Sequence, residues 1–220
     1  MLAIIVVLAF ALVAVIIYGF RQKKVIEKLK KMVIYDPLTR IFNRGYLDVE
    51  FLRIIREIRR RFKDAGKRKL KPLSFVMIDF DGLKSINDTC GHPVGDAFII
   101  SIANTLTAAI HRANDILARY GGDEFSVILP ETNPLAVQEI AEKMRLSVEN
   151  AKVENKAGPE SITISLGVVT VTDFTGCENI DADEIVKAII AHADSLLYEV
   201  KNMGGDRVIA KSMTLQEILA

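Results

Sequence analysis

The run Arg119–Pro130 constrains the fold of this chain more than any other stretch. It reads Arg-Tyr-Gly-Gly-Asp-Glu-Phe-Ser-Val-Ile-Leu-Pro, so residues that suit strands lie on both sides of two glycines. Paired glycines supply the positive φ that tight hairpin loops need, and the run therefore predicts an antiparallel hairpin. Asp123 and Glu124 at its turn repel each other unless a cation or a polar ligand lies above them. An exposed acidic turn is the alternative interpretation.

Helices and further strands are predicted on both sides of the hairpin. Leu73–Asp79 is a nearly continuous apolar run, typical of a central strand covered on both faces. Asn43 is suited to cap a helix that ends near Lys63, and Gly95–Asp96 to open one that ends near His111. The other predicted elements are a short helix ending near residue 86, helices over 134–150 and 181–202, and strands over 162–170 and 207–210. A hairpin between helices predicts the α+β class, one sheet with helices packed on it.

The N-terminal residues 1–20 are uncharged and almost wholly aliphatic. As a helix, Leu2–Phe20 would span about 28 Å, close to the roughly 30 Å hydrocarbon core of a bilayer. We expect a transmembrane helix here; a secretory signal peptide and a buried core helix are the alternatives. The basic residues that follow place the rest of the chain in the cytoplasm, as a single-pass protein of the inner membrane. The two cysteines agree with a reducing compartment.

Charge is divided unevenly along the chain. Residues 21–71 hold 18 Lys and Arg against 6 Asp and Glu, whereas residues 72–220 hold 11 against 22. The basic block is expected to attract anionic membrane lipid. Nucleic-acid binding is the weaker alternative, because basic and aromatic residues do not interleave and no groove-reading motif is present. Within this block, the apolar spacing of residues 21–34 predicts a linker helix that could pair as a short coiled coil.

Asp79 ends the predicted central strand, and the acidic hairpin turn is the natural neighbour of that strand end. Three carboxylates at one edge of a sheet are costly unless cations neutralise them. Oxygen ligands without nearby His or Cys favour Mg²⁺ or Mn²⁺ over zinc. A helix that begins after Gly82 offers free amides to a phosphate, with Lys84 adding a positive charge. These residues predict a metal-dependent phosphoryl-transfer site.

Asn87 and Asp96 suit recognition of a guanine base. A carboxylate accepts from both N1 and the exocyclic amine of guanine, which adenine cannot match, and an asparagine can add further hydrogen bonds. The alternative for Asp96 is a plain helix N-cap.

Taken together, these stretches resemble a GGDEF-domain diguanylate cyclase over residues 35–211. The matching stretches are Asp36-Pro-Leu-Thr with Asn43-Arg44, Ile78-Asp-Phe-Asp81, Lys84-Ser-Ile-Asn-Asp88, Gly91-His92, Gly95-Asp96, Arg119-Tyr-Gly-Gly-Asp-Glu-Phe125, Ser165-Leu-Gly167, Ala193-Asp194 and Tyr198-Glu-Val-Lys201. The resemblance implies a palm-like sheet related to nucleotide cyclases, and the condensation of two GTP into cyclic di-GMP by a homodimer. Residues 212–220 would then be a C-terminal tail.

The resemblance also implies roles for individual residues. Asp79, Asp123 and Glu124 would be catalytic: Asp79 and Asp123 ligate Mg²⁺ with help from the Phe80 carbonyl, while Glu124 helps activate the attacking 3′-hydroxyl. The implied substrate contacts are Asn87 and Asp96 on guanine, Lys84 and Lys201 on phosphates, and Gly121 and Gly122, which leave room for the triphosphate.

Arg112-Ala-Asn-Asp115 takes the place of the family's inhibitory product site, five residues before Gly121. A helix-end arginine paired with a turn aspartate is the alternative for that spacing. Two departures from the family pattern concern contacts to nucleotide: Gly82 replaces an aromatic residue, and Gly205 replaces an arginine. The alternatives to an active cyclase are a non-catalytic receptor for cyclic di-GMP or GTP and, against Asp96, a cyclase of adenine-containing dinucleotides. An upstream sensor protein is a further expected partner.

Overall fold

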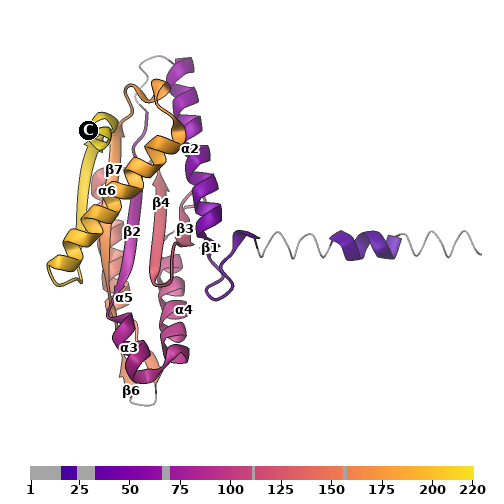
Figure 1. Cartoon of the computed structure of the whole chain (residues 1–220), viewed down its shortest axis with the longest axis vertical. Coiled ribbons are helices and arrows are strands. Elements are labelled where there is room, and N and C mark those ends of the chain that lie inside the picture. The colour runs from indigo at the N-terminus through magenta and orange to yellow at the C-terminus, as the bar shows by residue number, and fades with distance from the viewer. Residues whose placement is uncertain (1–15, 24–32, 66–69, 111, 156–157) are drawn as a thin grey trace, which may run out of the picture.

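The computed structural model describes residues 16–23, 33–65, 70–110, 112–155 and 158–220. These residues form one mixed six-stranded sheet in the order β1-β3-β4-β2-β7-β8, with helices on both faces (Figure 1). The strands are β1 (Phe42–Asn43), β2 (Leu73–Asp81), β3 (Ile116–Arg119), β4 (Glu124–Pro130), β7 (Thr163–Asp173) and β8 (Val208–Thr214). The helices are α2 (Arg44–Ala65), α3 (Leu83–Cys90), α4 (His92–Ala109), α5 (Pro134–Glu149), α6 (Ala182–Asn202) and α7 (Leu215–Leu219). A short pair, β5 (Val153–Asn155) and β6 (Gly158–Glu160), and the 3-10 turn η1 (Cys177–Asn179) complete the fold.

The α+β class and the central hairpin are confirmed. β2 lies between β4 and β7 and pairs antiparallel with both, whereas β1 with β3 and β7 with β8 are parallel pairs. The short elements β1, β5, β6, η1 and α7 were not expected, because two to five residues carry no periodic pattern.

Alternation along β2 divides the core between its two faces. Val76, Ile78 and Phe80 pack towards α3, α4 and α5, whereas Phe75 and Met77 pack towards α2 and α6. Continuing the same alternation places Asp79 on the α2–α6 face, where the strand reaches its exposed end. The side-chain period of the strand therefore brings this acid beneath α6.

Three helix starts follow the capping signals in the sequence. The amide of Tyr46 donates to Asn43 Oδ1 at 2.9 Å, that of Ala136 to Asn133 Oδ1 at 2.9 Å, and that of Asp183 to Asp181 Oδ1 at 2.8 Å. The predicted cap at Asp96 is wrong. Helix α4 begins at His92 after Gly91, so Asp96 lies inside the helix and is exposed.

The hairpin is present, but the role predicted for its glycines is wrong. Among the glycines that the structure describes, φ is positive at five others, including Gly82 and Gly205, and not at Gly121 or Gly122. The turn is held instead by Arg119, whose guanidinium donates to the Gly122 carbonyl at 2.7 and 3.2 Å. The Arg119 side chain, from the preceding strand, therefore stabilises the turn in place of the positive φ angles expected of the glycines.

The predicted transmembrane helix is not found: no helix within the described ranges is long and apolar enough to cross a membrane. This finding overturns the expected single-pass localisation in the inner membrane. Residues 1–15, on which most of that prediction rested, lie outside the described residues, as does segment 24–32 of the expected linker helix.

Residues 212–220, set apart as a tail, belong to the folded unit. They complete β8 and form α7, which begins with a capping box between Thr214 and Glu217. Leu215 and Ile218 are buried on the α2–α6 side of the core.

Candidate active site

Two acids lie side by side at the ends of neighbouring strands. Asp79 of β2 is directly opposite Glu124 of β4 in the antiparallel register, and opposite Ser165 of β7 on its other side. The Asp79 side chain is 24% exposed, and its Oδ1 atom is buried without a hydrogen-bond partner among the described residues. A buried carboxylate oxygen without a donor is costly, so this atom is prepared for a ligand.

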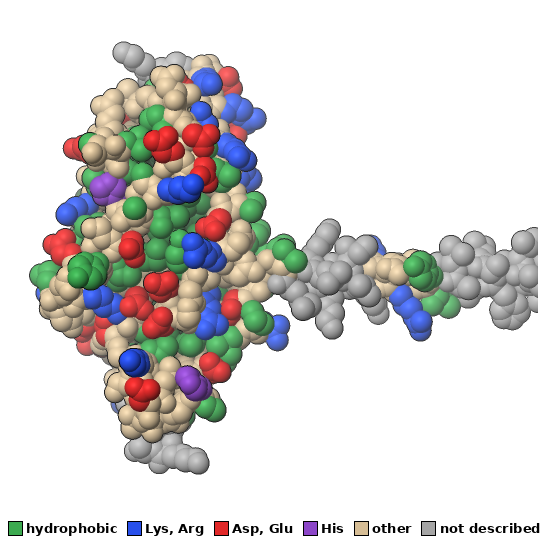
Figure 2. Space-filling view, in the orientation of Figure 1, with side chains coloured by type: hydrophobic (Ala, Val, Ile, Leu, Met, Phe, Trp, Pro, Cys, Tyr) green, Lys and Arg blue, Asp and Glu red, His purple; other side chains and the backbone are tan. Residues whose placement is uncertain are grey.

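Lys201, in the last turn of α6, reaches over the end of β2. Its ammonium forms an ion pair with Asp79 Oδ2 at 2.7 Å and donates to the Phe80 carbonyl at 2.6 Å and to Asp81 Oδ1 at 2.9 Å. Figure 1 shows α6 crossing the sheet over β2 and β7, and Figure 2 shows acidic and basic side chains gathered on this face. The structure thus brings the predicted Lys201 to two of the predicted metal-binding groups.

The pKa of Asp79 is raised, first by burial and further by the charge of Asp123, with Lys201 opposing both. The pKa of Glu124 is also raised, by burial and then by Asp79, Asp123 and Asp194. The four acids therefore act on one another through space, as expected for a site prepared for a cation.

Asp194 is a residue that the sequence analysis did not assign to the site. It is an exposed residue of α6, seven residues before Lys201, so the two side chains project from similar sides of the helix. Arg44 provides the opposing positive charge near Glu124; its guanidinium lies 4.4 Å from the Tyr120 ring centroid and pairs with Asp48 at 3.8 Å. The helical spacing between Asp194 and Lys201 could have indicated from the sequence that Asp194 belongs to the site.

Asp81 was likewise missed as a member of the site. Its carboxylate accepts from Thr163 Oγ1 at 2.8 Å, Ser165 Oγ at 2.7 Å and the Asp206 amide at 3.0 Å, besides Lys201. Burial opposes ionisation, but these hydrogen bonds outweigh it and lower the pKa of Asp81. Asp81 is therefore a charged anchor with its oxygens already satisfied, and the two-residue step from Asp79 along the strand could have indicated a shared face.

The donor set suits a hard cation. No group of three or more His, Cys, Asp or Glu side chains within the described ranges has a metal-binding arrangement, so metal binding by the acids of the hairpin turn and Asp79 stays a prediction. The Asp79 carboxylate and the Phe80 carbonyl do lie together, and an ammonium group already rests against both. Oxygen donors of this kind, completed by phosphate oxygens, are the ligands that Mg²⁺ accepts.

Gly121 allows the close approach of Glu124. A Cβ atom at Gly121 would lie 2.5 Å from Glu124 Oε2, whereas one at Gly122 would meet nothing within 4 Å. A Cβ at Gly121 would thus displace the end of the Glu124 side chain, while Gly122 faces open space, as expected for a position that a ligand approaches.

The predicted base-reading residues are brought together by α3 and α4. A Cβ at Gly95 would lie 1.9 Å from Asn87 Oδ1, so the two helices meet at this glycine and Asn87 lies beside the turn that carries Asp96. Lys84 is exposed in the first turn of α3, directly after the end of β2.

A second ion pair connects the start of the domain to the hairpin turn. Arg119, which holds Gly122, also donates to both oxygens of Asp36 at 3.2 and 3.3 Å. Both side chains are largely buried, at 17% and 14% exposure. The hydrogen bonds from Thr39 and the charge of Arg119 together outweigh burial and lower the pKa of Asp36.

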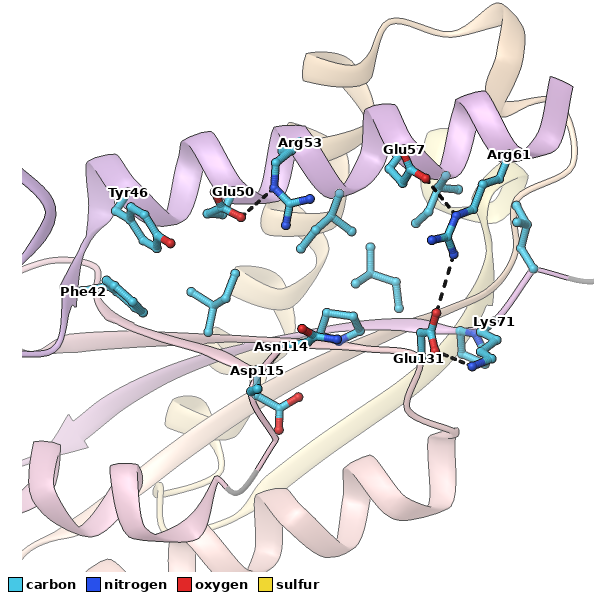
Figure 3. Close-up of a pocket in the computed structure, with 18 residues that line it drawn as sticks. Phe42, Tyr46, Glu50, Arg53, Glu57, Arg61, Lys71, Asn114, Asp115 and Glu131 are labelled. Atoms are coloured by element: carbon cyan, nitrogen blue, oxygen red, sulfur yellow. Dashed lines mark hydrogen bonds and ion pairs between the residues drawn. The ribbon is translucent and has the colours of Figure 1, made fainter. Parts of the chain in front are cut away.

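The predicted product site lies away from these acids. Arg112 is exposed and donates to Thr132 Oγ1 at 2.9 Å, and the Asp115 amide donates to the Arg112 carbonyl at 3.1 Å. Beside it, a cavity of about 600 Å³ separates α2 from the segments around Asn114 and Glu131 (Figure 3). Arg61 and Lys71 both pair with Glu131 at its rim.

The fold and the carboxylate site define a palm-like α+β domain. The chain belongs to the diguanylate cyclase GGDEF-domain family, whose model matches residues 33–207. It is 33% identical over 215 residues to the probable diguanylate cyclase DgcT of Escherichia coli, covering 89% of this chain and 43% of that protein. It is 35% identical over 182 residues to diguanylate cyclase A of Treponema denticola, covering 83% of this chain and 45% of the relative.

Solved structures show the same fold. The coiled coil and GGDEF domain of DgcB from Caulobacter crescentus, in complex with c-di-GMP, has a TM-score of 0.77 at 25% identity, covering 93% of this chain and 99% of the other. SiaD of Pseudomonas aeruginosa, a diguanylate cyclase in complex with its activator SiaC, has a TM-score of 0.68 at 29% identity, covering 88% and 68%. The chain spans half or less of the length of the first curated relatives.

Proposed function

We propose that the chain is a diguanylate cyclase that condenses two GTP into cyclic di-GMP, with release of two pyrophosphates. In each half-reaction the 3′-hydroxyl oxygen of one GTP attacks the α-phosphorus of the other. The bond to the β-phosphate breaks, pyrophosphate leaves, and Glu124 takes the proton of the hydroxyl. Each domain would hold one GTP, so two copies of the chain must meet face to face.

The observation that carries this proposal is the pairing of Asp79 with Glu124 at adjacent strand ends, with Asp79 Oδ1 buried and without a partner. We propose Mg²⁺, with Mn²⁺ as a substitute, held by Asp79, Asp123 and the Phe80 carbonyl. When bound, the metal neutralises charge on the reacting phosphates. Burial and the neighbouring acids raise the pKa of Glu124, which favours its taking up a proton.

The remaining proposed roles concern the nucleotide. Asn87 and Asp96 would bind the guanine edge from α3 and α4, and Lys84 and Lys201 would hold phosphates from opposite sides of the β2 end. Gly122 faces open space beside them. Arg207, two positions after Gly205, donates from its Nε to the Gly205 carbonyl at 3.1 Å.

The test is incubation of the full chain with GTP and Mg²⁺, followed by chromatography of the nucleotides. We expect cyclic di-GMP and pyrophosphate, loss of both in Asp123→Asn, and full activity in the matched control Asp64→Asn, an exposed carboxylate on α2. A folded wild-type chain that forms no product at high protein concentration would overturn the proposal. Binding of cyclic di-GMP in that case would identify a receptor instead.

We also propose product feedback through Arg112 and Asp115, which are joined by one backbone turn; Arg112 is exposed and Asp115 is half-buried. An exposed guanidinium beside a carboxylate can hold a guanine base and a phosphate of the product. Arg112→Ala is expected to continue synthesis at product concentrations that stop the wild type. Equal inhibition of both proteins would rule this site out. By analogy with SiaD and its activator, an upstream protein is proposed to control the chain.

A further inference from the structure

We propose that Lys201 occupies the cation position of the free enzyme, and that its displacement makes metal and nucleotide bind cooperatively. The inference rests on the proposed function and assigns a regulatory step to a residue otherwise expected only to hold phosphate. It begins from the three oxygen atoms that surround the lysine.

The Lys201 ammonium is fully engaged. It is placed 2.7 Å from Asp79 Oδ2, 2.6 Å from the Phe80 carbonyl and 2.9 Å from Asp81 Oδ1. An ammonium has three protons to donate, so three oxygen contacts leave none for another partner. In this arrangement the lysine is a built-in cation on the end of β2.

Two of these three oxygen-bearing groups are the ones proposed to bind metal. A second cation cannot share Asp79 and the Phe80 carbonyl with an ammonium at hydrogen-bond distance, because the two positive charges repel at short range in a partly buried site. Lys201 must therefore leave both groups before a metal ion can use them. Metal alone has to compete with a cation that the protein supplies itself.

Displacement removes hydrogen bonds that Lys201 needs, whereas the Asp81 carboxylate stays satisfied by other donors. Asp81 keeps its hydrogen bonds from Thr163, Ser165 and the Asp206 amide when the lysine departs. Lys201 loses all three of its oxygen contacts at once. Only a new anion restores them, and a triphosphate that arrives with the metal is such an anion.

The local structure allows this movement without unfolding α6. Lys201 is next to the last residue of the helix, and its side chain is 27% exposed. The helix end is closed separately, because the amides of Met203 and Gly205 donate to backbone carbonyls of the last turn. A flexible four-carbon stem can therefore swing while the backbone stays in place.

Linkage makes the consequence measurable. If nucleotide takes Lys201 away from Asp79, nucleotide raises the affinity for metal, and metal raises the affinity for nucleotide by the same factor. Coupling of this kind is typically about 5- to 150-fold. Removing the ammonium should reduce the coupling to the part that direct contact between metal and phosphate supplies and, at the same time, tighten the binding of metal alone.

The experiment measures Mn²⁺ binding to the full chain by electron paramagnetic resonance, with and without a GTP analogue that has a non-cleavable α,β-methylene bridge. For the wild type we expect weak binding of Mn²⁺ alone and binding about tenfold or more tighter with the analogue. For Lys201→Met we expect tighter binding of Mn²⁺ alone than in the wild type and a smaller gain with the analogue, because only the direct contact between metal and phosphate remains. Lys201→Arg keeps a cation in place and should bind Mn²⁺ alone as weakly as the wild type.

Lys211→Met is the matched control, because Lys211 is an exposed lysine on β8 that lies 3.9 Å from Glu199. It should behave as the wild type in both measurements. Equal or weaker binding of Mn²⁺ alone by folded Lys201→Met would overturn the inference, whether or not the wild type converts GTP. Failure of the wild type to synthesise the dinucleotide would instead contradict the proposed function.

Discussion

Gly167 of β7 is the position where one methyl group should disturb both the fold and the site. A Cβ at Gly167 would lie 2.2 Å from the Ala193 carbonyl oxygen and 2.5 Å from the Leu197 amide nitrogen. Ordinary contacts between carbon atoms lie at about 3.5–4.0 Å, so in Gly167→Ala α6 must withdraw by roughly 1–1.5 Å. Both obstructing groups are helix backbone, which cannot rotate away as a side chain can.

The expected stability loss is at the upper end for overpacked cores, about 3 kcal/mol. For a domain of this size that corresponds to a melting temperature lower by about 6–12 °C. Activity should fall as well, because Lys201 lies one turn beyond Leu197 on the same helix. A misplacement of about 1 Å at a reacting site can cost on the order of a hundredfold in rate.

The assay is thermal unfolding by circular dichroism together with the initial rate of cyclic di-GMP formation. Gly45→Ala is the matched control: Gly45 is exposed in the first turn of α2, and its added Cβ would meet only Asn43 Oδ1 at 3.5 Å. Alanine there should raise stability by up to about 1 kcal/mol. If Gly167→Ala melts together with the wild type, the packing argument is refuted.

Three further predictions concern the site. Glu124→Gln should abolish synthesis yet stabilise the fold at pH 7 by about 1 kcal/mol, after allowance for solvent screening. Because the pKa of Glu124 is raised, the ionised carboxylate destabilises the wild type above that pKa, and this penalty disappears as pH falls towards 4. A stability gain in Glu124→Gln that does not change with pH would contradict the reasoning. Asp36→Asn should lower the free energy of unfolding by about 1.5–3 kcal/mol at pH 7, because it loses charged hydrogen bonds with Arg119. Because the pKa of Asp36 is lowered, the stability difference between wild type and variant should vanish as pH falls below that pKa. A difference that stays constant in an acid titration would contradict the prediction. Gly95→Ala should keep or raise the melting temperature through helix propensity, but it should weaken binding of the GTP analogue about tenfold by displacing the Asn87 amide. An unchanged affinity in calorimetry would exclude a contact between Asn87 and the nucleotide.

Local signals in the sequence predicted most of the elements and several of their ends. Asn43, Asn133 and Asp181 cap helices because a short polar side chain can satisfy amides two or three residues away, and that interaction needs no tertiary partner. The nearly continuous apolar run Leu73–Asp79 also predicted a strand with Asp79 at its end. These features depend on neighbours within a few residues, which the sequence displays directly.

Other predictions failed where a distant side chain replaced a local device. The turn at Gly121 was expected to need positive φ, but Arg119 holds it through the Gly122 carbonyl and is itself oriented by Asp36, 83 residues earlier in the chain. Likewise, Asp79 and the acidic turn were expected to face a metal ion, whereas the strand order and the position of α6 also put the Lys201 ammonium against Asp79. No periodic pattern in the sequence indicates either arrangement.

The order of elements, the helix caps, the alternating core and the family motifs around Asp79 and Glu124 were therefore determined by the sequence itself. Only the tertiary structure decided that Lys201 lies against the Phe80 carbonyl, 121 residues away, and that Asp81 is saturated by donors from β7 and the loop before β8. The physical reason is range: a cap or a strand period is fixed by bonds between near neighbours, whereas charges on separate elements meet only where the packing of the sheet and α6 places them.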